Sequence, residues 1–202
     1  MTNDCFDIFR SHPFAKKEWY NVLVPGFDKR VATLMPCNKT QGQVQASENL
    51  RHRVINISLD DCNNPQTKAQ MTSWRKLKFQ VDEIKGFDCY TNFHGMDITR
   101  DHGCAMIKKW HSLIESFVQA KTTDGYIVRM FAIAFTKKTP RQVKATCYAK
   151  ASKKKLIRQK MIEIMTSTIQ KSTLRELVNI LYVLLFYFNF FLSILLMIFI
   201  ND

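Results

Sequence analysis

The sequence is poor in glycine, with six glycines in 202 residues. It contains no glycine-rich phosphate-binding loop and no Gly-x-Ser-x-Gly motif. The common nucleotide-cradling turn and the common serine-hydrolase nucleophile are therefore excluded. We expect this chain to bind no cofactor and to be no enzyme.

The chain also lacks paired cysteines. Its six cysteines are scattered and form no Cys-x-x-Cys pair. The opening segment "MTNDCFDIFR" carries acidic residues where a signal peptide would be apolar. Both observations favour reduced, intracellular thiols over a disulfide framework.

One short segment concentrates side chains that could ligate a metal. They are His94, Asp97, Asp101, His102, Cys104 and His111. Structural zinc sites pair their ligands at tight spacing, whereas His102 and Cys104 have no matching second pair. We therefore expect no metal site. Cys104 with His94 or His111 is the remaining candidate for a nucleophile and its base.

Acidic residues are scarce relative to basic ones, 17 against 30, which leaves a formal charge of +13. Such an excess most often indicates a polyanionic partner, either nucleic acid or an anionic membrane face. The imbalance is greatest between residues 136 and 171, where Glu163 is the one acid among eleven Lys or Arg residues. This composition predicts a phosphate-contacting surface, which positions a nucleic acid without reading its sequence.

Four segments have the composition of strands. Alternation of apolar and polar residues is clearest where Leu77, Phe79 and Val81 share one side. The segments are "PFAKKEWYNVLVP" (13–25), an arm leading into a strand; "HRVINISLDD" (52–61); "RKLKFQVDEI" (75–84); and "YIVRMFAIAF" (126–135), a buried strand after the Asp-Gly turn of "KTTDGY".

Helical spacing appears twice. Thr99 is a candidate N-cap for a helix that carries Ala105, Met106, Trp110, Leu113 and Phe117. The segment "KKKLIRQKMIEIMTSTI" predicts an amphipathic helix with one basic face and an apolar stripe of Leu156, Ile157, Met161, Ile164 and Met165. Helices mixed with mostly antiparallel strands, without regular βαβ alternation, predict an α+β fold.

The one long apolar run lies at 180–200 and carries no charge. As a single helix it would span about 31 Å, which matches the hydrocarbon core of a bilayer. It is therefore a candidate transmembrane helix, and the basic residues before it would stay in the cytosol. The other interpretation is that an unspliced intron or a shifted frame encodes this run.

Several short motifs occur together in a familiar order. They are "PFAKKEWY", "LRHRVINISLDD", "NFHGMD", "KKW", "LIE", "KTTDGY", "FTKK" and "IRQKMIEIM". In this order and spacing the chain resembles the eukaryotic small-subunit ribosomal protein family called S-three-a, or eS-one. The resemblance covers about 12–178, which we expect to form the ribosomal domain, basic from about 136. It excludes a non-matching extension at 1–11 and the apolar tail at 180–200.

The resemblance implies a function and partners. The family is a structural constituent of the small ribosomal subunit, binds ribosomal RNA through basic surfaces, and supports subunit assembly and translation. Its partners are ribosomal RNA, neighbouring small-subunit proteins, and initiation and assembly factors. It resides in cytoplasmic ribosomes after assembly in the nucleolus, and it has no catalytic site or cofactor. The alternative is a tail-anchored membrane protein derived from this family, with a membrane as partner only if the tail is genuine.

The resemblance also implies a fold and a set of RNA-binding residues. The fold is a mostly antiparallel, barrel-like β core with flanking helices, to which the tail would add a C-terminal apolar helix. The basic residues at matching positions are Lys16, Lys17, Lys108, Lys109, Lys137, Lys138, Arg141, Lys144, Arg158 and Lys160. We expect Trp19, Trp74 and Trp110 to be core residues rather than base-stacking platforms.

Overall fold

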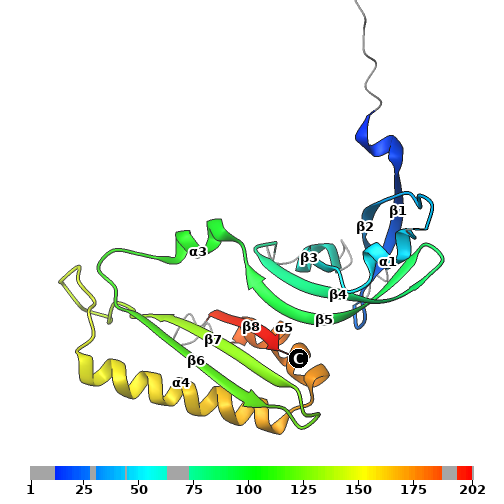
Figure 1. The fold of residues 1–202 in the computed structure, drawn as a ribbon. Coiled ribbons are helices and arrows are strands. Elements are labelled where there is room, and N and C mark those ends of the chain that lie inside the picture. Colours follow the sequence, from blue (N-terminus) through cyan, green and yellow to red (C-terminus); the bar gives the residue numbers. More distant parts are fainter. Residues whose placement is uncertain (1–11, 28–30, 44, 63–72, 188–194, 202) are drawn as a thin grey trace, which may run out of the picture. The chain divides into compact units, whose positions relative to one another are not determined.

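The computed structural model describes residues 12–27, 31–43, 45–62, 73–187 and 195–201. These residues belong to two compact units. The first comprises residues up to Ser73 together with Lys78–Phe93, and the second comprises Trp74–Leu77 together with residues from His94 onward. Helices and strands occur in both (Figure 1), which confirms the predicted α+β class.

The first unit begins with a short 3-10 helix, η1 (Pro13–Lys16), that leads directly into strand β1 (Lys17–Leu23). Pro13 suits the first turn because the missing N–H would have had no partner there. The Nδ1 atom of His12 accepts a hydrogen bond from the Phe14 N–H at 3.2 Å. The predicted arm and its strand are thus confirmed.

Strand β1 lies between two neighbours. It pairs antiparallel with β2 (Val31–Asn38) and parallel with β5 (Asp88–Ile98). A turn at Gly86, whose φ of +64° suits glycine, joins β5 to β4 (Arg75–Lys85), and β4 also pairs with β3 (Val54–Ser58). Helix α1 (Ala46–Leu50) belongs to the same unit.

The strand predicted at 52–61 is shorter than expected. Strand β3 ends at Ser58, and the next four residues form the helical turn α2 (Leu59–Cys62). This turn buries both Leu59 and Cys62, which a continued strand would have placed on opposite faces. Residues 63–72, which follow α2, lie outside the described residues.

The alternation predicted for β4 is confirmed. Leu77, Phe79 and Val81 are buried, while the residues between them are exposed or half-buried. The Phe79 side chain is 1% exposed and meets Phe93 edge-to-face at 6.2 Å between ring centroids. Burial of a large aromatic side chain is a major stabilising term for a unit of this size.

The second unit is built on a hairpin and a long helix. Strands β6 (Leu113–Lys121) and β7 (Ile127–Phe135) pair antiparallel around the predicted Asp-Gly turn. Helix α4 (Ala151–Lys171) lies along β6 (Figure 1) and buries Met161, Met165 and Ile169. The amphipathic helix is confirmed. Its stripe differs from the prediction, because Leu156 and Ile164 lie on the solvent side of the buried i, i+4 row.

The predicted buried strand at 126–135 is buried on one face only. In β7, Val128, Met130, Ala132 and Ala134 are buried, whereas Ile127 is 42% exposed. A half-buried strand of a hairpin alternates in this way because successive side chains point to opposite faces. The continuous apolar run obscured that alternation.

The helix predicted to reach Phe117 is wrong beyond its first turns. Helix α3 spans Arg100–Met106, and Leu113 and Phe117 lie in strand β6, where they are 39% and 68% exposed. The alternate positions of β6, such as Ile114 and Val118, are the buried ones. As a strand, this segment forms its backbone hydrogen bonds with β7 and buries alternate side chains. These interactions decide its structure, and the helical spacing of its apolar residues does not.

The C-terminal residues do not form the single helix predicted for 180–200. Helix α5 spans Leu174–Tyr187, and Leu195–Asn201 form strand β8, which pairs antiparallel with β7 and β5. The physical reason is that β6 pairs with only one edge of β7, so the other edge is available to β8, and a run rich in Ile, Leu and Phe suits a strand. In the described part of the chain, no helix combines the length and apolar character needed to cross a bilayer. The extension at 1–11 and residues 188–194 of the tail lie outside the described residues.

Antiparallel pairing predominates among the strand pairs whose register is given. Within the second unit, the strands follow the order β5-β8-β7-β6. In the first unit the order is β2-β1-β5, with β4 on β5 and β3 on β4. The barrel-like closure of the β core stays a prediction.

The start of α5 provides a direct test of local stability. Thr173 and Glu176 form a capping box: the Thr173 N–H donates to Glu176 Oε2 at 3.0 Å, and the Glu176 N–H donates to Thr173 Oγ1 at 3.3 Å. We expect Thr173→Ala to lower the free energy of unfolding by about 1 kcal/mol in urea titrations. Thr166→Ala, inside α4, is the control and should be neutral or slightly stabilising.

The same cap should respond to pH. The hydrogen bonds from Thr173 lower the pKa of Glu176 from its usual value of 4.5. A lowered carboxyl pKa stabilises the fold above the unfolded-state pKa, and this contribution is lost as the pH falls through the folded-state pKa. The difference between the wild type and Glu176→Gln, which removes the titrating carboxylate, should therefore shrink in acid. A difference that stays constant below pH 4.5 would contradict the role of Glu176.

Candidate nucleic-acid interface

Two loops of the second unit are joined by hydrogen bonds that converge on Thr136. These loops, 107–112 and 136–149, are called the basic loop pair below; the longer one ends before Lys150, the N-cap of α4. The Thr136 hydroxyl oxygen accepts from the Ser112 N–H at 2.8 Å and donates to the Cys147 carbonyl at 2.6 Å. The Thr136 N–H also donates to the Ser112 carbonyl at 3.2 Å. The Thr136 side chain thus holds the start and the end of the longer loop against the shorter one.

Further contacts extend this attachment. The Cys147 N–H donates to the Trp110 carbonyl at 2.7 Å, and the Ala149 N–H donates to Ser112 Oγ at 3.0 Å. His111 Nδ1 contacts the Thr136 carbonyl oxygen. His111 and Cys147 form a parallel bridge. Backbone and side-chain hydrogen bonds between the two loops therefore define their geometry.

Within the longer loop, Gln142 acts as an internal brace. Its Nε2 donates to the carbonyls of Lys144 at 3.0 Å and Thr146 at 2.6 Å, and its Oε1 accepts from the Thr139 N–H at 3.3 Å. Arg141, next to it, has a φ of +69°. These bonds curl the loop and leave its charged side chains outside. Sequence reasoning did not identify Thr136 or Gln142, because neither belongs to a motif with recognisable spacing.

The basic loop pair gathers six of the ten predicted RNA-binding residues. All six side chains are exposed, and neither loop contains an acidic residue. No described acidic side chain forms a salt bridge with any of them. Uncompensated cations on a defined backbone suit phosphate contacts, since each one can replace condensed counterions. The six are Lys108, Lys109, Lys137, Lys138, Arg141 and Lys144.

The two predicted residues on α4 are already engaged within the protein. Arg158 Nε donates to the Glu115 carbonyl at 3.3 Å, which ties α4 to β6. Lys160 forms a salt bridge with Glu163 at 2.8 Å on the exposed helix surface. Exposed pairs of this kind are weak, so Lys160 can exchange its partner for a phosphate. Binding of RNA by either residue stays a prediction.

The remaining two predicted residues, Lys16 and Lys17, belong to the first unit. They lie at the junction of η1 and β1. The Lys17 ammonium group is 5.9 Å from the centroid of the Phe14 ring, and the Phe14 and Trp19 rings are 5.7 Å apart. This arrangement is a small cationic and aromatic surface of its own.

The tryptophan predictions need correction. Trp19 is 46% exposed and Trp110 is 54% exposed, so neither is a core residue. Trp74 is half-buried and stacks on His102 at 4.1 Å between ring centroids. The Trp110 prediction relied on a helix that in fact ends at Met106, four residues earlier. Helical spacing therefore does not apply to its side chain.

Two of the histidines near α3 serve structural contacts. His102 stacks on Trp74, and His111 is bonded into the basic loop pair. Across the described ranges, no three His, Cys, Asp or Glu side chains are grouped closely enough to hold a metal ion. Cys104 is exposed, while burial raises the pKa of the Cys89 thiol and so disfavours its nucleophilic form.

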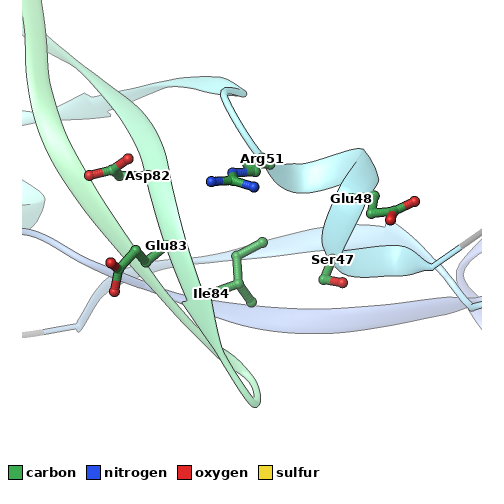
Figure 2. A pocket seen from close by; sticks show the side chains of 6 residues that line it. All are labelled: Ser47, Glu48, Arg51, Asp82, Glu83 and Ile84. Carbon is green, nitrogen blue, oxygen red and sulfur yellow. The ribbon is translucent and has the colours of Figure 1, made fainter.

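One small cavity, of about 300 Å³, lies in the first unit (Figure 2). It is lined by Ser47 and Glu48 of α1, by Arg51 at the C-cap of that helix, and by Asp82, Glu83 and Ile84 of β4. Three carboxylates against one guanidinium make this lining negative. This lining therefore disfavours phosphate, and the basic loop pair remains the better candidate for a nucleic-acid interface.

Hydrogen bonds between the two loops of the basic loop pair can be tested by mutation. Thr136→Val keeps the shape of the side chain but leaves the Ser112 N–H and the Cys147 carbonyl without this partner. We expect the free energy of unfolding to fall by about 2 kcal/mol in urea titrations. Thr139→Val, at an exposed position in the same loop, should change it by less than about 0.5 kcal/mol. Equal effects would show that Thr136 is not the connecting residue.

Together these features define a basic α+β protein with exposed cations on a pair of braced loops. The sequence profile of the Ribosomal S3Ae family matches residues 9–183, which is most of the chain. The chain belongs to the Ribosomal S3Ae family. This confirms the resemblance seen in the sequence motifs and makes the chain a ribosomal protein of the small subunit by family.

Proposed function

We propose that this chain is a structural constituent of the small ribosomal subunit and binds ribosomal RNA through its basic surfaces. The observation that carries the proposal is the basic loop pair, in which six exposed cations have no described acidic partner. Membership of the Ribosomal S3Ae family supports the same conclusion independently. Phosphate contacts of this kind hold a protein in place on RNA.

RNA is the nucleic acid that such a surface suits. In A-form helices of RNA the major groove is too deep and narrow for side chains to read, so proteins recognise RNA largely by its shape and its backbone. Loops whose cations are spread over a defined backbone can follow that shape. The proposed role includes support of subunit assembly, in the nucleolus, and of translation in the cytoplasm. Neighbouring small-subunit proteins, assembly factors and initiation factors are the further partners that we propose.

Sucrose-gradient sedimentation of the tagged chain from cells tests this function. We expect the chain to sediment with small subunits at low salt and to be released as salt is raised, because phosphate contacts weaken with ionic strength. A chain that stays at the top of the gradient at low salt would refute the proposal. A variant carrying glutamine at the six loop cations separates specific incorporation from trapping, since it should fail to sediment with subunits.

A further inference from the structure

Two aromatic side chains are exposed within the basic loop pair. Trp110 is 54% exposed and Tyr148 is 63% exposed. Both belong to the hydrogen-bonded framework, because the Trp110 carbonyl accepts from Cys147, the residue before Tyr148. Isolated apolar residues on a surface are common. Here, in contrast, two large aromatic residues lie on one hydrogen-bonded framework that also carries six cations, so they are not isolated.

The backbone holds Trp110 in an unusual conformation. Its φ is +69°, a left-handed value that bulky residues rarely adopt. Only three described residues other than glycine have a positive φ, and two of them, Trp110 and Arg141, lie in the basic loop pair. Strained conformations of this kind persist where the surrounding structure imposes them, often at binding sites. Here the bond from Cys147 to the Trp110 carbonyl contributes to imposing it.

The surrounding charge identifies the chemistry of the partner. Lys108 and Lys109 directly precede Trp110, and the longer loop adds four more cations without any acid. A ligand must therefore offer negative groups beside a flat apolar surface. Unpaired nucleotides do so, since their phosphates carry the charge and their bases offer ring faces that a duplex would conceal. A basic protein partner would be repelled.

We propose that the basic loop pair binds unpaired nucleotides of RNA, with Trp110 as a stacking platform for a base and Tyr148 as a second aromatic contact. This inference rests on the proposed function and narrows it, from RNA in general to single-stranded segments at this site. The cations place the backbone, and the rings select segments whose bases are free. Preference for a particular base is not expected, because every base has a stacking face.

Binding of labelled oligonucleotides to the full chain, followed by fluorescence anisotropy, tests the proposal. The probes are adenine and uracil homopolymers of about 12 nucleotides and an RNA duplex of the same length. Trp110→Leu keeps an apolar side chain but removes the ring face. We expect it to weaken single-strand binding about tenfold and to leave the duplex affinity unchanged. Trp110→Phe should restore most of the affinity.

The controls separate stacking from charge and from folding. Phe117→Leu removes another exposed ring, 68% exposed on β6, and should not change single-strand binding. The salt dependence of Trp110→Leu should match that of the wild type, since no charge is lost. Near-ultraviolet circular dichroism and urea titration check that the variant folds. A parallel loss for single strand and duplex would overturn stacking and assign Trp110 a role in loop structure.

The remaining outcomes distinguish this inference from the function on which it rests. Wild-type protein that binds the duplex but not the single strands would overturn the inference and leave the proposed function standing. The inference would also be overturned if the Trp110→Leu protein bound single strands as tightly as the wild type does. Trp110 would then be assigned to a contact with another protein. Wild-type protein that binds no RNA, even at about 50 mM salt, would refute both.

Discussion

Replacing the six cations of the basic loop pair by glutamine should weaken binding to small-subunit ribosomal RNA roughly 10³-fold at about 0.1 M salt. Each exposed cation can contact one phosphate, and each contact adds about 0.7 to 0.9 to the slope of log K against log salt concentration. The slope should therefore become shallower by about 4 to 5 if all six make contact. Titrations at several salt concentrations measure the affinity and the slope together.

A control variant with the same change of net charge shows whether the loss of affinity is specific to the basic loop pair. Six exposed cations outside the basic loop pair can be replaced by glutamine in the same way, and they too comprise five lysines and one arginine. Their loss should reduce affinity far less, because they are not concentrated on one surface. Equal losses in the two variants would mean that net charge, rather than the basic loop pair, determines binding. The control positions are Lys39, Lys76, Lys85, Lys121, Lys171 and Arg175.

Truncation of Phe79 to alanine should lower the free energy of unfolding by about 3 to 5 kcal/mol. The side chain is 1% exposed in the first unit, and its ring meets both Phe93 and Phe27 edge-to-face. The variant loses the transfer free energy of the ring, leaves a cavity, and breaks aromatic contacts worth about 1 kcal/mol each. Urea unfolding followed by circular dichroism measures the difference.

Phe87→Ala is the matched control for this substitution. Phe87 lies in the same unit, in the turn between β4 and β5, and is 63% exposed. Its truncation should cost less than about 1 kcal/mol, because little area leaves water on folding. If the two variants were equally stable, Phe79 would not be at the centre of the core. A Phe79→Ala chain that fails to fold at all would agree with the larger expected loss.

Local patterns predicted the elements whose periodicity is uninterrupted. The alternation around Phe79 in β4 and the helical row of Met161 and Met165 in α4 are properties of short segments, so they are visible in the sequence. The Asp-Gly turn between β6 and β7 is another such property. The family could be identified for a related reason, because its motifs are short stretches in a set order.

Two elements were predicted wrongly because their state depends on distant partners. The residues at 113–121 and 195–201 each have a composition compatible with a helix. Both pair with β7, which offers one edge to β6 and the other to β8. A short apolar run cannot be assigned by periodicity alone when a free strand edge is available elsewhere in the chain.

The candidate site, too, was predictable from the sequence only in part. The excess of lysine and arginine after residue 136 was evident from composition, and so were the individual residues. That Lys108 and Lys109 belong to the same surface as Lys137 and Lys138 was not, because the bonds through Thr136 and Cys147 connect segments far apart in sequence. The exposure of Trp110 also depends on those bonds.

The sequence by itself determined the basic character of this protein, its α+β class and its family, because charge, alternation and short motifs are local properties. Only the tertiary structure decided which cations share a surface, which aromatic rings face solvent, and which apolar runs become strands. Those outcomes depend on hydrogen bonds and packing between distant segments, and their free energies appear only when the chain has brought the segments together.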